Sequence, residues 1–185
     1  MTQFKLHTFE TAPEGSKEIL EGAKKQNGFI PNLYAIMAES PEVLKAYTQM
    51  NQLFTETSLS NEEKNIVWLT VSYSNSCHYC MTIHSMVAKM FKLSDEIIEA
   101  LRNGQPLNDP KLQALRKFTE TMVEKRGWAS DDELQKFMDA GYSRKNALEL
   151  IVGIGQKIIS NYVNHISHTP LDEQIKDFKW EAPSK

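Results

Sequence analysis

The sequence predicts an all-α protein of about eight helices in a single domain. Apolar residues recur at spacings of three and four along most of the 185-residue chain, and the period-two alternation typical of strands is rare. Serine followed by acidic residues stands before several of these segments, as at helix starts. No Pro- or Gly-rich linker, low-complexity run or internal repeat divides the chain, so we expect one domain over residues 1–185.

Glycine and proline delimit the first predicted helices. The pair Asn27-Gly28 is a common stop signal and ends the first of them. Pro31 precedes a short second helix, and Ser40, followed by proline and glutamate, is an N-cap with a first-turn proline for the third. These three helices are predicted over residues 16–26, 32–38 and 41–54.

The later helices begin at capping signals. Ser60 and Ser130 each have a glutamate three residues later, which is the capping-box pattern. Asn75 and Ser76 interrupt the fourth helix and are expected to cap the fifth, and Pro170 stops the helical pattern after the last one. The predicted ranges are 61–74, 77–91, 95–103, 110–126, 131–140 and 143–167.

Composition and charge exclude several functional classes. The formal net charge is −3 and no predicted helix has a basic stripe, so we expect no nucleic-acid surface. No segment reaches the roughly 20 apolar residues of a membrane-spanning helix, so we expect no membrane partner. Residues 1–10 lack the apolar segment of a signal peptide, and we therefore expect a cytoplasmic protein.

Two cysteines and a histidine form the candidate catalytic site. Cys77, Cys80 and His84 are spaced i, i+3 and i+7, so a helix beginning at Cys77 places them on one face within two turns. Both sulfurs then lie in the first turn, where unpaired N–H groups and the helix dipole favour the thiolate. His84 can exchange a proton, and cysteines one turn apart can close into a disulfide. This pattern predicts thiol–disulfide chemistry.

Other interpretations use the same residues. Free cysteine is often buried, so the pair could belong to an ordinary core. A zinc site would need a fourth ligand besides the three candidate residues, and His165 or His168 could supply it. Covalent haem attachment is excluded, because it needs histidine directly after the second cysteine, where this chain has Met81. A thioredoxin-like motif would lie beside a strand, and none is predicted.

Two stretches resemble a known family. Residues 60–90, centred on CHYCMTIH, resemble the alkyl hydroperoxidase D-like branch of the carboxymuconolactone decarboxylase superfamily, and NYVNHISHTPLD at 161–172 resembles its peroxidase-related members. The resemblance extends over residues 31–172 and implies an all-α AhpD-like fold, a homo-oligomer such as a trimer or hexamer, and peroxide reduction. It also implies that Cys80 attacks the peroxide, Cys77 resolves the product and His84 belongs to a proton relay. Decarboxylation is not expected, because the decarboxylases lack this cysteine pair.

The sequence departs from the family at two positions. The family's best-studied peroxidases have a glutamate twelve residues before the first cysteine, at the far end of the relay. This chain has Asn65 there, whose amide cannot exchange a proton at neutral pH. Glu62, one turn earlier, is the alternative acid. Tyr79 stands where those peroxidases have a histidine. Both departures leave the two cysteines in place, so thiol chemistry is still expected. The resemblance no longer implies efficient peroxidase turnover.

We therefore expect a peroxide-reducing thiol oxidoreductase with a C-x-x-C dithiol cycle. Its substrate is expected to be a hydroperoxide, and an unknown dithiol reductant is expected to restore it. No cofactor and no metal ion are expected at the site. The alternative is a redox-sensing or zinc-binding helical protein without efficient peroxidase turnover. His165 is a further candidate for a pocket or a subunit interface.

Overall fold

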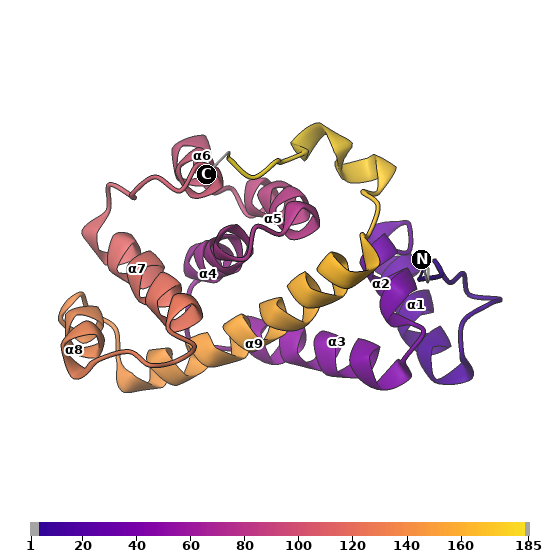
Figure 1. Cartoon of the computed structure of the whole chain (residues 1–185), viewed down its shortest axis with the longest axis horizontal. Helices are drawn as coiled ribbons and strands as arrows, with labels where there is room; N and C mark the ends of the chain where they lie inside the picture. Colours follow the sequence, from indigo (N-terminus) through magenta and orange to yellow (C-terminus); the bar gives the residue numbers. More distant parts are fainter. Residues whose placement is uncertain (1–3, 184–185) are drawn as a thin grey trace.

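The computed structural model describes residues 4–183 and confirms the all-α class, since no strand occurs among these residues. Eight α-helices in this range have seven or more residues, as expected, and α2 and the 3-10 helix η1 are shorter (Figure 1). Residues 1–3 and 184–185 of the expected domain lie outside the described residues. The elements are α1 (Glu14–Asn27), α2 (Asn32–Met37), α3 (Pro41–Thr55), α4 (Asn61–Ser74), α5 (His78–Met90), α6 (Asp95–Arg102), α7 (Pro110–Glu124), α8 (Asp131–Asp139), α9 (Arg144–Ser167) and η1 (Glu173–Phe178).

The predicted capping boxes are present. The Ser60 hydroxyl accepts a hydrogen bond from the Glu63 N–H at 3.1 Å, and the Glu63 carboxylate accepts one from the Ser60 N–H at 2.8 Å. Ser130 and Glu133 repeat this arrangement at the start of α8, and Ser143 begins α9 in the same way. An N-cap of this kind typically contributes about 1 kcal/mol, so these serines define where the helices begin.

The junction between α4 and α5 differs from the prediction. Ser76 adopts a left-handed conformation with φ 52°. The N–H groups of Ser76 and Cys77 donate to the carbonyls of Tyr73 and Ser72, at 2.8 and 2.9 Å. These bonds satisfy carbonyls at the end of α4. Asn75 and Ser76 therefore complete α4 and do not cap α5, whose N-cap is Cys77.

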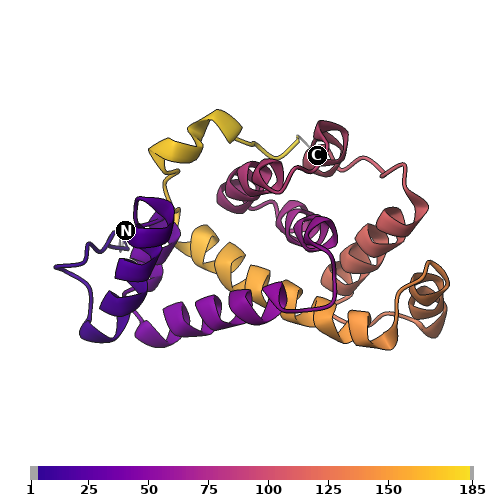
Figure 2. The ribbon, with the colours of Figure 1, turned by 180° about the vertical axis from the view of Figure 1, so that it is seen from behind.

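Helix α4 lies at the centre of the arrangement. Every residue from Glu63 to Ser72 is buried, and α4 contacts α5, α7 and α9. The long helix α9 runs beside α3, as the two ribbon views show (Figures 1 and 2). Gly153 permits this close approach, because a Cβ at that position would lie 2.6 Å from ring atoms of Phe54. None of the helices in residues 4–183 is long and apolar enough to cross a membrane.

Buried apolar side chains of the described residues form two clusters. The larger one is built around α4 and α7 and extends to α9. The smaller one joins α1, α2 and α3 to the start of α5 and to η1, and it contains Cys77, Tyr79, Cys80 and Ile175. The two candidate cysteines are therefore part of the packed interior and not of a surface cleft.

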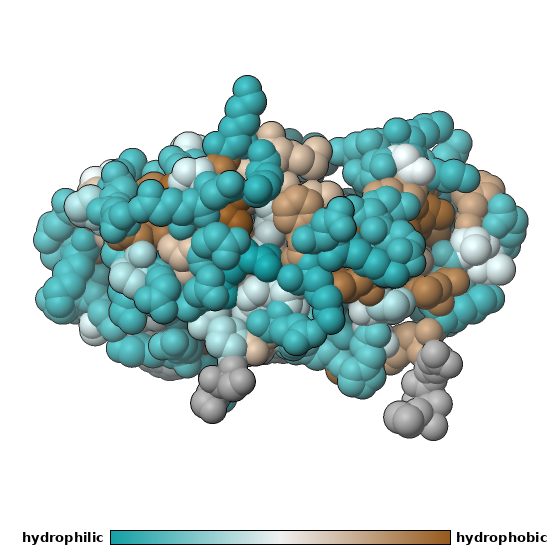
Figure 3. All heavy atoms as spheres, turned by 90° about the horizontal axis from the view of Figure 1, so that it is seen from above, coloured by the Kyte–Doolittle hydropathy of each residue, from teal (hydrophilic) through white to brown (hydrophobic). Residues whose placement is uncertain are grey.

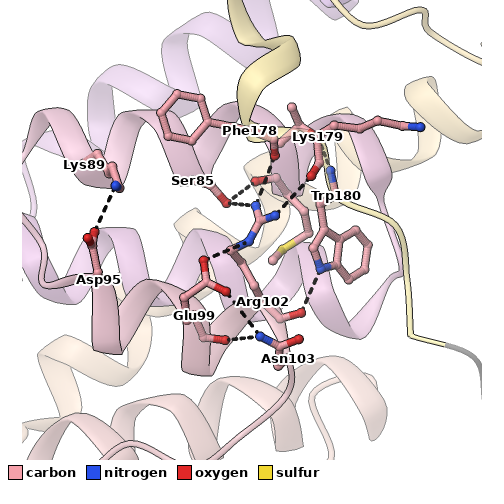
Figure 4. Close-up of polar contacts among 11 residues, drawn as sticks. Ser85, Lys89, Asp95, Glu99, Arg102, Asn103, Phe178, Lys179 and Trp180 are labelled. Carbon is pink, nitrogen blue, oxygen red and sulfur yellow. Dashed lines mark hydrogen bonds and ion pairs between the residues drawn. The ribbon is translucent and has the colours of Figure 1, made fainter.

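The segment that follows α9 packs back over α5. Trp180 is buried; its backbone N–H donates to Thr82 Oγ1 at 3.1 Å and its indole N–H to the Arg102 carbonyl at 2.7 Å. The Arg102 guanidinium donates to the carbonyls of Phe178 and Lys179, at 3.1 Å each (Figure 4). Seen from above, this side of the molecule is mainly hydrophilic, with separate hydrophobic areas (Figure 3). The described part of the polar tail thus docks on its own chain.

Candidate active site

Both candidate cysteines lie at the amino end of α5 as free, fully buried thiols. Cys77 is the N-cap, Cys80 lies in the first turn, and His84 follows one turn later with 8% of its surface exposed. All three side chains meet residues of α9, so the common face predicted from their spacing exists and is turned toward α9. The Cys77 side chain makes no capping hydrogen bond, so the free N–H groups of α5 do not bind its sulfur.

Polar side chains of α9 contact the two sulfurs. Asn164 Nδ2 donates to Cys80 Sγ at 3.2 Å and lies 3.7 Å from Cys77 Sγ. The Cys80 thiol donates to Ser160 Oγ at 3.5 Å, and the Ser160 hydroxyl donates to the Lys157 carbonyl at 3.0 Å. When Cys80 ionises, Ser160 can turn its hydrogen toward the sulfur. An amide and a hydroxyl are therefore available to a Cys80 thiolate.

His84 is hydrogen-bonded to a buried lysine. Lys157 Nζ lies 2.7 Å from His84 Nε2, and Lys157 has no exposed surface. Because an ammonium group has only donors, Nε2 accepts and the ring proton belongs on Nδ1. Burial and then the Lys157 charge hold the pKa of His84 well below its usual range, so the ring is neutral. The Trp68 ring lies beside it, with 5.0 Å between centroids.

The two thiols differ in acidity. Burial opposes the ionisation of Cys80, but a hydrogen bond from the Cys77 thiol and the charge of Lys157 outweigh it. Together with the nearby polar side chains of Ser160 and Asn161, they lower the pKa of Cys80 to about 5. The pKa of Cys77 is raised, first because its thiol is hydrogen-bonded to Cys80 and second because it is buried. At neutral pH the pair therefore holds one thiolate, on Cys80, beside one thiol.

Two residues considered for the proton relay make no hydrogen bond to this cluster. Asn65 is buried, its Nδ2 donates to the Asn61 carbonyl at 2.8 Å, and its Oδ1 has no partner among the described residues. Glu62 is exposed in the first turn of α4. Neither residue has a hydrogen bond to His84, whose partner in the described chain is Lys157.

Tyr79, between the two cysteines, ties α5 to two other segments. Its hydroxyl donates to Asp172 Oδ2 at 2.6 Å and accepts from the Leu33 N–H at 3.4 Å. Asp172 Oδ1 accepts from the Asn32 N–H at 2.8 Å, at the start of α2. Burial and then the Asp172 charge raise the pKa of Tyr79 well above its usual range, so it stays a donor. Tyr79 therefore has a structural contact in this chain.

The two histidines considered as extra ligands are exposed. His165 lies on α9 with its ring centroid 6.5 Å from that of Tyr162, and His168 caps the end of α9 in a left-handed conformation. Within residues 4–183, no group of three or more His, Cys, Asp or Glu side chains is arranged to hold a metal ion. The described geometry thus does not bring His165 or His168 to the cysteines.

The α9 residues of the site were not identified from the sequence. These residues are Lys157, the adjacent pair Ser160 and Asn161, and Asn164. The pair lies three to four residues from each of the other two, and all four residues are buried. A polar stripe at helical spacing in an otherwise apolar helix was the signal that could have revealed them. It shows that one face of α9 is turned toward a polar interior site.

The chain is similar to a known family and to solved structures. The model of the carboxymuconolactone decarboxylase family matches residues 41–121, and no curated protein matches the chain. A solved peroxidase-related protein with an alkylhydroperoxidase AhpD core, from Ralstonia eutropha JMP134, is similar with a TM-score of 0.84 at 14% identity, over 94% of this chain and 93% of that one. A peroxidase-related protein from Silicibacter sp. TM1040 has a TM-score of 0.78 at 19% identity, with 93% and 91% covered.

A third similar structure is that of a debrominase. It is the debrominase Bmp8, with a cysteine replaced by alanine and in complex with 2,3,4-tribromopyrrole. Its TM-score is 0.79 at 15% identity, with 96% of each chain covered. At these identities the three similarities establish the fold over nearly the whole chain.

Proposed function

We propose that the chain is a single-domain thiol oxidoreductase that reduces hydroperoxides. It belongs to the carboxymuconolactone decarboxylase superfamily and has the fold of the AhpD-like branch of that superfamily. The observation that carries the proposal is the contrast between the two buried cysteines. Cys80 is the acidic thiol, in contact with Asn164 and Ser160, and Cys77 is the protonated thiol beside it. A thiolate paired with a thiol is what a two-cysteine peroxide cycle requires.

The proposed cycle has three steps. The Cys80 thiolate attacks the terminal oxygen of a hydroperoxide; an S–O bond forms, the O–O bond breaks, and the leaving alkoxide or hydroxide takes up a proton. Cys80 is then a sulfenic acid, and the Cys77 sulfur attacks it, so that a disulfide forms and water leaves with the Cys77 proton. An external dithiol exchanges with this disulfide, becomes oxidised itself and restores both cysteines.

His84 is the group proposed to supply the proton for the leaving oxygen. Its Nε2 is occupied by Lys157, and its Nδ1 is buried without a partner in the described chain. When this Nδ1 hydrogen passes to the leaving oxygen, Nε2 takes a proton from the Lys157 ammonium, so the ring stays neutral. Asn65 adds no proton-exchanging group, so we expect slower turnover than a site with a relay carboxylate would have.

Burial of both sulfurs favours a second candidate function. A dithiol reductant must reach one sulfur, and neither Cys77 nor Cys80 has any exposed surface. If reduction is slow for this reason, the chain would act as a redox sensor that forms its disulfide without efficient turnover. The two functions share the oxidation step and differ in how fast the dithiol is regenerated.

Peroxide consumption with a small dithiol as reductant tests the proposal. We expect turnover by the wild type, none by Cys80→Ser, and about one equivalent by Cys77→Ser, whose sulfenic acid a dimedone-type probe should label. His84→Gln should slow turnover by about 10²–10⁴-fold, the usual contribution of an acid–base group. His168→Gln is the matched control, because His168 is exposed and lies just after the last residue of α9. Wild-type rates in Cys80→Ser would refute the function, and one-equivalent oxidation without turnover would favour the sensor.

We also infer that the chain works as a homo-oligomer. Helix α9 exposes Leu148, Ile151, Tyr162 and Ile166, which lie on one face. Between residues 150 and 167 the sole Asp, Glu, Lys or Arg is the buried lysine of the site. Large apolar areas are uncommon on monomers, and such a stripe is complementary to an antiparallel copy of itself. Sedimentation should show an assembly that Ile166→Glu weakens; a wild-type monomer at micromolar concentration would contradict the inference.

A further inference from the structure

Lys157 is a buried cation without a carboxylate partner. Its side chain has no exposed surface, and within residues 4–183 its ammonium makes one hydrogen bond, to His84 Nε2. Transfer of an ammonium group into a protein interior is strongly unfavourable unless an opposite charge lies close to it. A neutral imidazole supplies an acceptor but no charge. A protonated Lys157 is therefore stable at this position only with a negative group close to it.

The buried carboxylates of the described chain are engaged elsewhere. Glu63 pairs with Lys111 at 3.1 Å, near the start of α4. Asp172 accepts from the Tyr79 hydroxyl at 2.6 Å and from the Asn32 N–H at 2.8 Å.

Two other buried cations lie on helices packed against α9. Lys64 of α4 donates to the Thr55 carbonyl, and Arg116 of α7 pairs with Glu120. None of these groups balances Lys157.

The titratable side chains of the smaller apolar cluster, which contains both cysteines, are neutral, with one exception. Burial raises the pKa of Tyr34 on α2 and of Tyr47 on α3, so both phenols keep their protons. The thiol of Cys77 also keeps its proton, because it is hydrogen-bonded to Cys80 and buried. Cys80 is the exception. It lies one turn before His84, the partner of Lys157, and its sulfur is 3.5 Å from Ser160 Oγ, whose hydroxyl donates to the Lys157 carbonyl. At this place the Lys157 charge favours the ionised form of Cys80. The counter-charge of Lys157 is therefore the Cys80 sulfur.

We propose that Lys157 is a positioning residue that holds Cys80 as the thiolate and keeps the His84 proton on Nδ1. The inference deepens the function proposed above, and its catalytic consequence rests on that function. Asn65 offers no charge at the relay position, and Lys157 supplies the charged group of this site from α9 instead. The lysine does not touch the peroxide; it acts through the sulfur and the imidazole.

The geometry at His84 explains the second part of the proposal. An ammonium at 2.7 Å from Nε2 can only donate, which makes Nε2 the acceptor and Nδ1 the protonated atom. Nδ1 is buried and free of protein partners in the described chain, so its hydrogen remains available to the leaving oxygen. Without Lys157, neither tautomer would be selected in this way.

The test compares Lys157→Met, Lys157→Arg and the wild type in the reduced state. The ultraviolet absorbance of the thiolate, followed against pH, reports Cys80 without any need for a reagent to reach it. We expect the wild-type inflection well below the free-cysteine value of about 8.5. Lys157→Met should raise it by about one to three pH units, and Lys157→Arg should keep it low. Lys64→Met is the matched control, because Lys64 is also buried but donates to the Thr55 carbonyl.

A second measurement uses the nitrogen-15 shifts of the His84 ring, which distinguish its tautomers. The wild type and Lys157→Arg should have Nε2 unprotonated, and Lys157→Met should lose this preference. A wild type with no thiolate below neutral pH, or a folded Lys157→Met that titrates like the wild type, would overturn the inference. Should Lys157→Met not fold, the wild-type titration and ring shifts decide.

These readouts separate the inference from the function. In one case the protein consumes no peroxide, but Cys80 is acidic and its titration moves in Lys157→Met. That result would refute the proposed function and support the role of Lys157. If instead the protein turns over peroxide and its thiolate titration is the same in Lys157→Met as in the wild type, the proposed function is supported and the role of Lys157 is refuted.

Discussion

Replacing Asn164 by leucine removes the shorter of the two hydrogen bonds between α9 and the Cys80 sulfur. Asn164 Nδ2 lies 3.2 Å from Cys80 Sγ, against 3.5 Å for Ser160 Oγ. The Asn164 Oδ1 has no partner in the described chain, so leucine of similar volume leaves no protein donor unpaired. The substitution thus tests the amide donor with little disturbance of the packing.

The expected effect follows from the charge on the acceptor. A hydrogen bond to a charged group contributes about 1.5–3 kcal/mol, and 1.36 kcal/mol corresponds to about one pKa unit. Because the amide stabilises the thiolate over the thiol, its loss should raise the pKa of Cys80 by about one to two pH units. The reaction with peroxide requires the thiolate, so the rate–pH profile should move to higher pH. At a fixed pH below the wild-type inflection, the rate should fall about tenfold for each pH unit by which the profile moves.

Rapid mixing with hydrogen peroxide over a range of pH values measures this change. Asn164→Asp, which has the same shape but adds a negative charge, should move the profile further in the same direction. His165→Leu, at the exposed neighbouring position of α9, should leave it unchanged. If Asn164→Leu folds and keeps the wild-type inflection, the α9 amide does not determine the acidity of Cys80, and our account of the site is wrong.

Three further substitutions test the structure around the site. Tyr79→Phe leaves the buried carboxylate of Asp172 without its phenol donor, and we expect the free energy of unfolding in urea to fall by about 1–3 kcal/mol; an unchanged value would contradict the importance of this contact. Gly153→Ala places a Cβ 2.6 Å from the Phe54 ring and should lower the same free energy by about 1–3 kcal/mol, unless α9 can move away from α3. Arg102→Leu removes the donors to the carbonyls of residues 178 and 179, so limited proteolysis of the C-terminal segment should be faster. Equal rates would show that the two hydrogen bonds of Trp180 are sufficient to hold it.

Local signals predicted most of the helices. The capping boxes at Ser60 and Ser130 depend on contacts three residues apart, so the sequence contains all their information. The range of α4 was predicted correctly, but the cap of α5 was not. Asn75 and Ser76 were expected to cap α5, whereas a left-handed Ser76, a conformation usually taken by glycine, completes α4 and leaves Cys77 as the N-cap. The 3-10 helix at residues 173–178 has no periodic apolar pattern and is stabilised by packing on α5, so it was not predicted.

The site was predictable only on the side of α5. The common face of Cys77, Cys80 and His84 follows from helical spacing within eight residues. Their partners Lys157 and Asn164 lie 73 to 87 positions further along the chain, and no local rule brings those positions together. Position at a helix start also did not show which cysteine is more acidic. That difference depends on donors and charge from α9, which become visible only in three dimensions.

The position of α9 near the end of the chain has a consequence for synthesis. During translation, Cys77 and Cys80 emerge long before Asn164, which donates to both sulfurs, and before Asp172, which binds the tyrosine between them. A nascent chain that ends before Lys157 has both thiols but neither the cation nor the amide that makes one of them acidic. Its cysteines should therefore ionise and oxidise as ordinary thiols, and the reactive sulfur should exist only after the last long helix has docked.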